Sequence, residues 1–537
     1  MIDKPENYNL LVERWIPILW SDGRFVRVNI RTALIEAGRI RQIAASNPMD
    51  NVALLRFLLA VLQWCKPTLS DEDRESLRSA GGIPEGWLQK TLDSEGRPKS
   101  AFNLLGSGDR FYQDQRLSRE KPNRFPSDLF AYFPADTEVN HFRHVWDRTI
   151  ALCPACCALG LVRLSACATQ GGRGYSPSIN NAPPIYILPI GGTLLETLWL
   201  NWPLQPTAAK DGPAWEPGKR PADKIGILEA LTWQPRAVWL GPLIEDSGRT
   251  CARCPAAGPL ICRVVWKQGR SLKTDGREWQ KDPHVAWAAS KGGSVEDRAL
   301  RAADPLKYSL RESALWSQTI RAVLESAGDD PRIPSVASAI AQLQQPADLR
   351  VMCFEPFTKK AKTFDEHRDG WCISLNLLRN QHLRDLATRE LDRLERLDFS
   401  KCLPARSRSL PGTAPVPGTP EVAREAARSI IAGETQDQLC QRFRTFLNDL
   451  AQAVTDEKAD QCVKRWQDGA HGILQKALDS AFSLTTACAP LGRQEAAEIA
   501  RRRLDRAIGE VAASDKEPST ARGSAEGKRG SQKRGEE

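Results

Sequence analysis

The sequence predicts an α+β protein: a large mixed N-terminal domain with a zinc-knuckle element, followed by a C-terminal four-helix bundle. Three observations support this prediction. Short apolar runs separated by turn residues fill the first part of the chain, apolar residues at helical spacing fill the last third, and two Cys-x-x-Cys knuckles lie in the first part. With 537 residues, the chain is more than three times as long as a typical domain of about 150 residues, so several domains are expected.

Composition and charge narrow the class of protein. The chain is 41% hydrophobic and 26% charged, values that exclude a wholly disordered chain and a fibrous repeat. Its net charge of +9 arises from 75 basic against 66 acidic residues. This mild surplus permits a basic groove for nucleic acid without establishing one.

The sequence shows no sign of export or membrane insertion. Its most apolar stretch, residues 52–64, is interrupted by Arg56 and is shorter than the roughly 20 residues that a spanning helix needs. No basic region followed by an apolar one stands at the start. We therefore expect a cytoplasmic protein without a membrane partner, whose 14 cysteines are reduced thiols or metal ligands.

The N-terminal domain begins with alternating short elements. Residues 9–12 and 15–20 are apolar runs, and Asp22-Gly23 supplies a hairpin turn. Beyond Ile30, the spacing of residues 34, 37, 40 and 41 fits a helical stripe, and residues 51–63 fit a buried helix that is entered through Pro48.

The middle of the chain is rich in loops and strands. Residues 100–150 are polar and aromatic and predict loops, whereas residues 185–188 predict a strand. Five prolines in residues 203–222 predict a long surface connection. Tryptophans and cysteines concentrated in residues 232–290 indicate a folded, mostly β region.

The last third is helical in pattern. Apolar residues recur at helical spacing within residues 383–394, 443–450 and 474–482, and an Arg-rich helix is expected over about 494–511. Residues 513–537 contain no large apolar side chain, which is typical of a disordered tail. The predicted division is a mixed domain over 1–375, a four-helix bundle over 376–512 and a disordered tail over 513–537.

The most specific local signal is the pair of Cys-x-x-Cys knuckles. Cys153 with Cys156, and Cys251 with Cys254, offer four sulfurs for one tetrahedral zinc ion. The separation between the knuckles is much longer than in an ordinary zinc ribbon. Buried free cysteines and a redox pair are the alternatives, and other thiols could substitute as ligands: Cys157, Cys167 and Cys262.

Two further segments could contact nucleic acid. The run Gly171-Gly172-Arg173-Gly174 lacks the Lys-Ser/Thr of a phosphate-binding loop, but its small side chains would let the backbone approach a groove closely. A basic loop surrounds Lys359, Lys360 and Ala361, and a third basic segment follows the second knuckle at Lys267, Arg270 and Lys273. The alternatives are a plain connector for the glycine run, and solvated turns or strand edges for the basic segments.

Signatures of catalysis are scarce. His367-Arg368-Asp369 echoes a kinase catalytic loop, but no Asp-Phe-Gly follows it. His141 and His144, with Asp136 and Asp147, could form the metal site of a nuclease. The sequence otherwise favours binding over catalysis.

The order of these features resembles the CasA family, the large subunits of the type I-E Cascade surveillance complex. The resemblance covers about residues 7–512. It rests on residues 9–17, the helix at 53–60, both knuckles, the glycine run with the loop that follows it and ends in Ala182-Pro183-Pro184, the Leu231-Thr232-Trp233-Gln234-Pro235 motif and the C-terminal helices.

This resemblance implies a non-catalytic subunit that recognises the protospacer-adjacent motif (PAM) in double-stranded target DNA, mainly from the minor groove. Such a subunit starts unwinding for R-loop formation and helps to recruit the helicase–nuclease. The implied partners are guide crRNA, target DNA, and the backbone, small, 5′-handle and 3′-hairpin subunits.

The resemblance also assigns residues. PAM contact falls on Gly171, Gly172, Arg173, Gly174, Lys267 and Arg270, guide contact on Asn140 and His141, and structural zinc on the four knuckle cysteines. The duplex-splitting wedge falls on Lys359, Lys360 and Ala361. No glutamine stands at this tip, where the best-known members have one, and the lysine pair could instead hold separated strands by their phosphates. Two rival hypotheses are a zinc-stabilised scaffold that never touches DNA and the metal-dependent nuclease described above.

Overall fold

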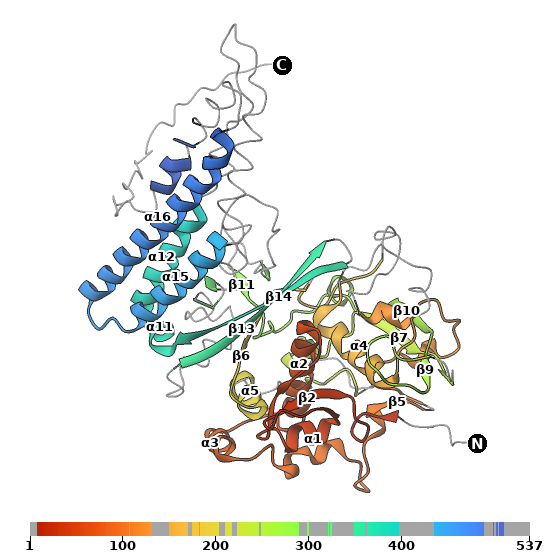
Figure 1. The fold of residues 1–537 in the computed structure, drawn as a ribbon. Coiled ribbons are helices and arrows are strands. Elements are labelled where there is room, and N and C mark those ends of the chain that lie inside the picture. Colours follow the sequence, from red (N-terminus) through yellow and green to blue (C-terminus); the bar gives the residue numbers. More distant parts are fainter. Residues whose placement is uncertain are drawn as a thin grey trace, which may run out of the picture.

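The structure is a computed structural model that describes most of the chain (Figure 1). The described residues are 8–106, 108–130, 150–169, 174–181, 183–202, 210–216, 223–245, 249–288, 298–299, 320–321, 323–324, 348–359, 362–396, 434–487, 498, 501–502 and 504–509. Side chains are not described for residues 288, 298–299, 348–349, 355–359, 362–369, 371, 395–396, 434, 436 and 481–487. In the part of the chain that is described, no helix is both long and apolar enough to cross a membrane.

Short strands and helices alternate through the first part of the chain. The elements are β1 (Tyr8–Asn9), β2 (Ile16–Trp20), β3 (Phe25–Val28), α1 (Ile30–Ile35), β4 (Ile40–Ile43), α2 (Pro48–Cys65), α3 (Asp71–Ser79), β5 (Asn103–Leu105), α4 (Pro154–Cys167), β6 (Tyr186–Pro189), α5 (Leu194–Asn201), α6 (Ile227–Leu231), β7 (Arg236–Leu240), β8 (Leu243–Ile244), β9 (Leu260–Ile261), β10 (Val264–Gln268), α7 (Leu272–Asp275), β11 (Trp287–Ala288) and β12 (Arg298–Ala299). Short 3-10 turns occupy Glu85–Thr91, Ser100–Phe102, Gln115–Leu117 and Pro126–Leu129.

A long hairpin and a set of helices follow. They are β13 (Asp348–Lys359), β14 (Lys362–Ser374), α11 (Leu375–Arg379), α12 (Gln381–Arg396), α15 (Glu434–Ala451) and α16 (Asp456–Ala487). The chain is therefore mixed α/β, as the sequence predicts.

Helix α2 forms the centre of the N-terminal part. The Asn47 side chain accepts a hydrogen bond from the Met49 amide, and Pro48 occupies the first helical position, where the missing amide hydrogen costs nothing. Nearly every residue from Met49 to Trp64 is buried, because α4, α5 and α6 pack around the helix. The expected buried helix is confirmed, and it supplies the scaffold for the site described below.

The first sheet corrects one expectation. The helical stripe predicted to continue through residues 40 and 41 is wrong, because α1 ends at Ile35 and β4 pairs with β2 in a sheet of order β3-β2-β4. The amide of Gly38 donates to the Gly81 carbonyl, and a Cβ at Gly38 would lie 2.4 Å from that oxygen. At this close contact between the two backbones, the chain changes direction from α1 into β4.

The proline-rich connection is also less exposed than its composition predicts. Within the described residues 210–216, Trp215 is 2% exposed and packs its ring against Phe57 and Trp64. The Asp211 carboxylate accepts hydrogen bonds from the amides of Leu228 and Glu229, and so caps α6. This part of the connection therefore contributes to the core through Trp215 and caps α6 through Asp211, although the prolines around these two residues predict a surface loop.

The long hairpin joins the two parts of the molecule (Figure 1). Strands β14, β13 and β6 form one antiparallel sheet in that order. Along β6 and the residue before it, side chains point alternately to two cores. Tyr186 and Leu188 face the N-terminal core, whereas Ile185 and Ile187 face the core of the C-terminal helices. The sheet is therefore shared by both cores.

The C-terminal helices pack around one apolar core. Helices α12, α15 and α16 bury one face each, with Phe443, Phe446 and Trp466 in ring contact at its centre. The expected helix at 494–511 is described only in part, and there Leu504 and Ile508 are buried in the same core. The four-helix bundle and the three-part domain division remain predictions.

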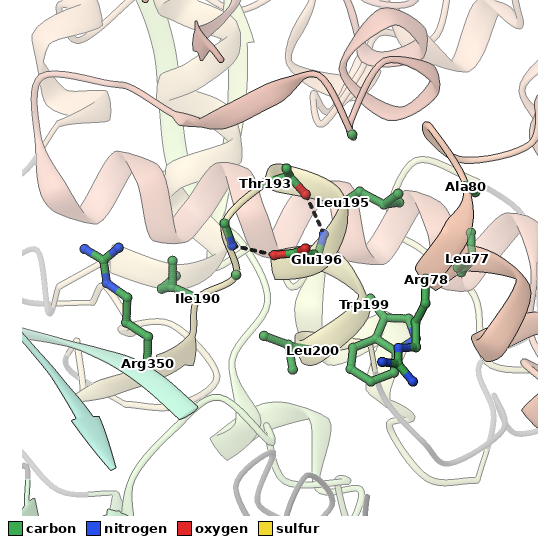
Figure 2. A pocket seen from close by; sticks show the side chains of 13 residues that line it. Leu77, Arg78, Ala80, Ile190, Thr193, Leu195, Glu196, Trp199, Leu200 and Arg350 are labelled. Atoms are coloured by element: carbon green, nitrogen blue, oxygen red, sulfur yellow. Dashed lines mark hydrogen bonds between the residues drawn. The ribbon is translucent and has the colours of Figure 1, made fainter. Parts of the chain in front are cut away.

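A cavity of about 590 Å³ lies between α3, α5 and β13. Its lining includes Leu77, Trp199 and Leu200, with Arg350 at its rim, and Figure 2 shows Thr193 and Glu196 at the N-terminus of α5 beside it. None of the residues predicted to bind metal or nucleic acid lines this cavity.

Candidate functional site

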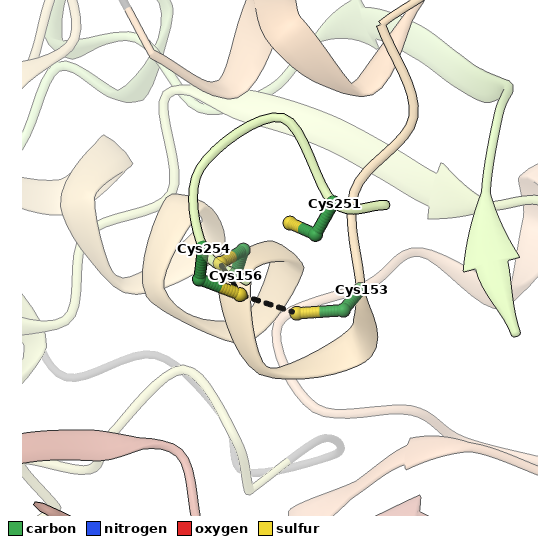
Figure 3. A group of neighbouring side chains, drawn as sticks. All are labelled: Cys153, Cys156, Cys251 and Cys254. Carbon is green, nitrogen blue, oxygen red and sulfur yellow. Dashed lines mark hydrogen bonds between the residues drawn. The ribbon is translucent and has the colours of Figure 1, made fainter. Parts of the chain in front are cut away.

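The four knuckle cysteines converge on one point. Cys153 directly precedes α4 and Cys156 lies in its first turn, while Cys251 and Cys254 lie in the loop between β8 and β9 (Figure 3). Their four sulfurs lie within 4.8 Å of one another. Within the described part of the chain, the possible substitutes Cys157, Cys167 and Cys262 lie outside this group, and every cysteine is a free thiol.

The spacing of these sulfurs fits a tetrahedral metal ion. The Cys254 sulfur lies 3.6 Å from that of Cys153 and 3.7 Å from that of Cys156. Four sulfurs at about 2.3 Å from a central zinc would be about 3.8 Å apart. A hydrogen bond from Cys156 lowers the pKa of the Cys254 thiol, which favours the thiolate form that a metal ion requires. With all four ligands supplied by the protein, such an ion would have no open position for a substrate.

An arginine from a distant strand approaches the sulfurs. The Arg27 side chain, on β3, donates to the Cys156 sulfur at 3.7 Å and is partly buried. A zinc ion with four thiolates carries a net charge of −2, which a neighbouring guanidinium partly offsets. The site thus ties the first sheet, α4 and the β8–β9 loop together.

A buried carboxylate anchors the second knuckle to the core. Asp50, on α2, is fully buried and accepts from Arg163 at 2.6 Å and from Arg253 at 2.5 Å. Arg253 lies between the two cysteines of its knuckle, and Arg163 lies on α4. One carboxylate therefore fixes both elements that supply the sulfurs.

The glycine run is described only at its end. Gly174 has a φ of +89°, which favours glycine, and a Cβ there would meet nothing within 4 Å. Two residues later, the Ser176 amide donates to the Gln268 side-chain oxygen at 2.7 Å, and the Ser176 hydroxyl bonds to that of Ser271 at 2.8 Å. The end of the glycine run therefore lies beside the end of β10.

Two of the predicted DNA-contacting cations, Lys267 and Arg270, have described side chains, and these differ in their surroundings. Lys267, on β10, has a side chain 50% exposed and pairs with Glu120 at 2.5 Å. Arg270 lies over the Trp233 ring at 3.9 Å and pairs with Glu229 at 2.5 Å and Asp275 at 2.9 Å. Lys267 is thus held by one exposed ion pair, whereas Arg270 belongs to a partly buried network.

Several predicted residues lie outside the described part of the chain. These are Gly171, Gly172, Arg173, Lys360, Ala361, Asn140 and His141, together with the nuclease candidates His144, Asp136 and Asp147. Lys359 is described by its backbone, which pairs with Lys362 in the last described rung of the β13–β14 hairpin.

Comparison with known proteins decides the family. Residues 9–477 match the family described as CRISPR-associated protein Cse1. The chain belongs to the Cse1 family. A CasA/Cse1 protein from Thermus thermophilus is 32% identical over 374 residues, which span 63% of this chain and 71% of that protein.

Solved Cse1 structures share the fold. Cse1 from Acidimicrobium ferrooxidans matches with a TM-score of 0.65 at 23% identity, covering 94% of this chain and 99% of that one. A chain of a structure described as a CRISPR RNA-guided surveillance complex matches with a TM-score of 0.61 at 17% identity, covering 93% and 100%. The predicted CasA resemblance is therefore confirmed.

Proposed function

We propose that this Cse1-family chain is the large subunit of an RNA-guided CRISPR surveillance complex and recognises the PAM in duplex DNA. One observation carries the step from family to function. Two segments that are far apart in the sequence, the end of the glycine run and the Lys267-bearing strand, are joined by the hydrogen bond from Ser176 to Gln268. The family resemblance assigns both segments to the same DNA groove, which requires them to lie close together.

The chemistry of these segments suits the minor groove. A loop of glycines has little side-chain bulk and can enter a groove about 6 Å wide. Because the minor groove distinguishes few base pairs, several related PAMs should be accepted. Lysine contacts to phosphates hold the duplex, and the tip at Lys359–Ala361 starts the strand separation, which costs a few kcal/mol and is offset by guide pairing.

The remaining roles belong to the same proposal. The chain acts in the cytoplasm without catalysis of its own, contacts the guide crRNA near Asn140, and assembles with the backbone, small, 5′-handle and 3′-hairpin subunits. It helps to recruit the helicase–nuclease. The four cysteines hold a structural zinc ion, for which their spacing is the supporting observation.

The proposal is tested by duplex binding of the guide-loaded complex with and without this chain. The targets form a library that varies only the bases beside the guide-matched segment. Adding the chain should tighten binding at least tenfold next to a short motif and leave other targets nearly unchanged. Equal binding to all library members, with or without the chain, would favour the scaffold hypothesis.

Changing Lys267 to alanine should weaken DNA binding through the phosphates. We expect the plot of log binding constant against log salt to become shallower by about 0.9, because one phosphate contact is lost, with no change in the preferred motif. Arg119 is the matched control, since it is another exposed cation in the segment that carries Glu120. An unchanged salt slope for Lys267→Ala would remove this residue from the interface.

A further inference from the structure

A buried arginine contacts both ends of the glycine run. The Arg236 guanidinium, on β7, donates to the carbonyl of Thr169 at 2.7 Å and to the carbonyl of Ser176. It also donates to the Pro235 carbonyl at 2.9 Å. Thr169 precedes the glycine run and Ser176 follows it, so a single planar group joins the chain before and after the run.

The surroundings of Arg236 show that this contact is built into the core. The residue is 3% exposed, and its guanidinium lies 5.1 Å from the Tyr175 ring and 5.8 Å from the Trp266 ring. Burial lowers the pKa of Arg236 to about 10, which leaves it charged at neutral pH. A buried charge is costly unless it is hydrogen-bonded, and here three backbone carbonyls accept from the two terminal nitrogens of the guanidinium.

The same short motif supports the neighbouring basic segment. Arg236 directly follows the Leu231–Pro235 motif, whose Gln234 and Pro235 carbonyls accept from the amides of Arg270 and Gly269 at 2.9 Å and 3.1 Å. A Cβ at Gly269 would lie 2.6 Å from the Arg236 backbone nitrogen. The motif therefore holds the base of both segments that we assign to the DNA groove.

We propose that Arg236 is a positioning residue that clamps the base of the glycine run and thereby presets it for the minor groove. The proposal rests on the function proposed above. A loop whose ends are joined explores fewer conformations, so a larger fraction of molecules is ready to bind. Because Arg236 is only 3% exposed, we expect its guanidinium to make no contact with a phosphate.

If Arg236 positions the glycine run, its substitution should have a different effect from the loss of a residue that contacts DNA. In the guide-loaded complex, Arg236→Met should weaken binding to a target with the preferred motif about tenfold, because the competent fraction falls. The slope of binding against salt should stay unchanged, since no phosphate contact is lost. Arg236→Lys keeps the charge but lacks the planar fork that bridges two carbonyls, so most of the loss should remain.

Arg110 supplies a matched control at the opposite end of β7. Its guanidinium donates to the carbonyls of Gly106 at 2.9 Å and Leu240 at 3.1 Å, and lies 4.1 Å from the Trp239 ring. Arg110→Met thus removes a partly buried arginine that also bridges two carbonyls but lies away from the glycine run. It should lower the melting temperature of the chain while leaving the preference for the motif unchanged.

A second readout follows the loop itself. Trypsin cleaves after arginine, and Arg173 lies within the glycine run. In the assembled complex, cleavage after Arg173 should be several-fold faster in Arg236→Lys than in the wild type or in Arg110→Met. This readout uses the milder variant, so it does not depend on Arg236→Met assembling.

The outcomes separate this inference from the proposed function. Motif-dependent binding in the wild type that persists fully in Arg236→Lys, with unchanged cleavage after Arg173, would overturn the clamp. Motif-independent binding in the wild type would instead overturn the proposed function. Tenfold weaker motif binding, an unchanged salt slope and faster cleavage together are the results that we expect.

Discussion

Replacing Cys251 with serine should abolish binding of the proposed zinc ion and cause the largest loss of stability of any single substitution in or around the cysteine cluster. The four sulfurs come from elements that are far apart in the sequence, so losing one ligand loosens α4 and the β8–β9 loop together. We expect zinc to fall from about one ion per chain to under a tenth. The free energy of unfolding should fall by about 4 kcal/mol or more, a size typical of losing a structural metal.

Elemental analysis of the purified chain and denaturant unfolding test this prediction. Cys157→Ser is the matched control, because Cys157 is fully buried beside the group but its sulfur is not part of it. The control should keep its zinc. A wild-type chain that is purified without chelators and contains no zinc, or a Cys251→Ser chain that keeps it, would contradict the metal assignment.

Replacing Asp50 with asparagine should produce the second largest effect. The Asp50 carboxylate neutralises Arg163 and Arg253, whose side chains are 2% and 8% exposed. Removing its charge takes away the carboxylate that both buried guanidinium groups contact, and breaking a buried ion pair in this way costs about 3–5 kcal/mol. Because Arg253 lies inside the second knuckle, zinc should also dissociate faster from this variant.

Chemical denaturation and a chelator-competition assay measure both effects. Asp22→Asn serves as the control, because Asp22 pairs with Arg24 at 2.7 Å but both side chains are more than half exposed. An exposed ion pair contributes little to stability, because solvent screens the two charges. If Asp50→Asn were no more destabilising than Asp22→Asn, the buried carboxylate would not anchor the knuckle.

Much of the fold was predictable because the spacing of apolar residues along the sequence indicates which face of an element is buried. The apolar run within residues 51–63 and the spaced apolar residues of α12, α15 and α16 predicted helices that the structure contains. The prediction of a helix that continues through Ile40 was wrong. Over only a few residues, apolar side chains at helical spacing also fit a helix that ends and a strand that begins after it. The contact between Gly38 and Gly81, which ends the helical path, joins distant residues and leaves no local signal.

The sequence predicted the cysteines of the candidate site, but not the arginines that hold the surrounding segments in place. The two Cys-x-x-Cys pairs predicted the four sulfurs that the structure brings within 4.8 Å of one another, since two such pairs in one chain are typical of metal ligation. Arg27 and Arg236 were missed, because a single arginine in a strand looks the same whether it faces solvent, a sulfur or a carbonyl. The position of Arg236 directly after the Leu231–Pro235 motif was the one available signal, and it acquires meaning only when Thr169 and Ser176 are seen beside it.

Minor-groove recognition is tested most directly by changing one groove at a time. Once the preferred motif is known, each purine in it is replaced by an analogue that adds or removes the N2 amino group, which faces the minor groove, or by a 7-deaza analogue, which alters only the major groove. Binding of the guide-loaded complex that contains this chain is then measured. We predict that changes at N2 alter affinity at least tenfold at one or more positions, and that the 7-deaza analogues have little effect. A loss confined to the 7-deaza analogues would show that the motif is read from the major groove, and would contradict the role proposed for the glycine run.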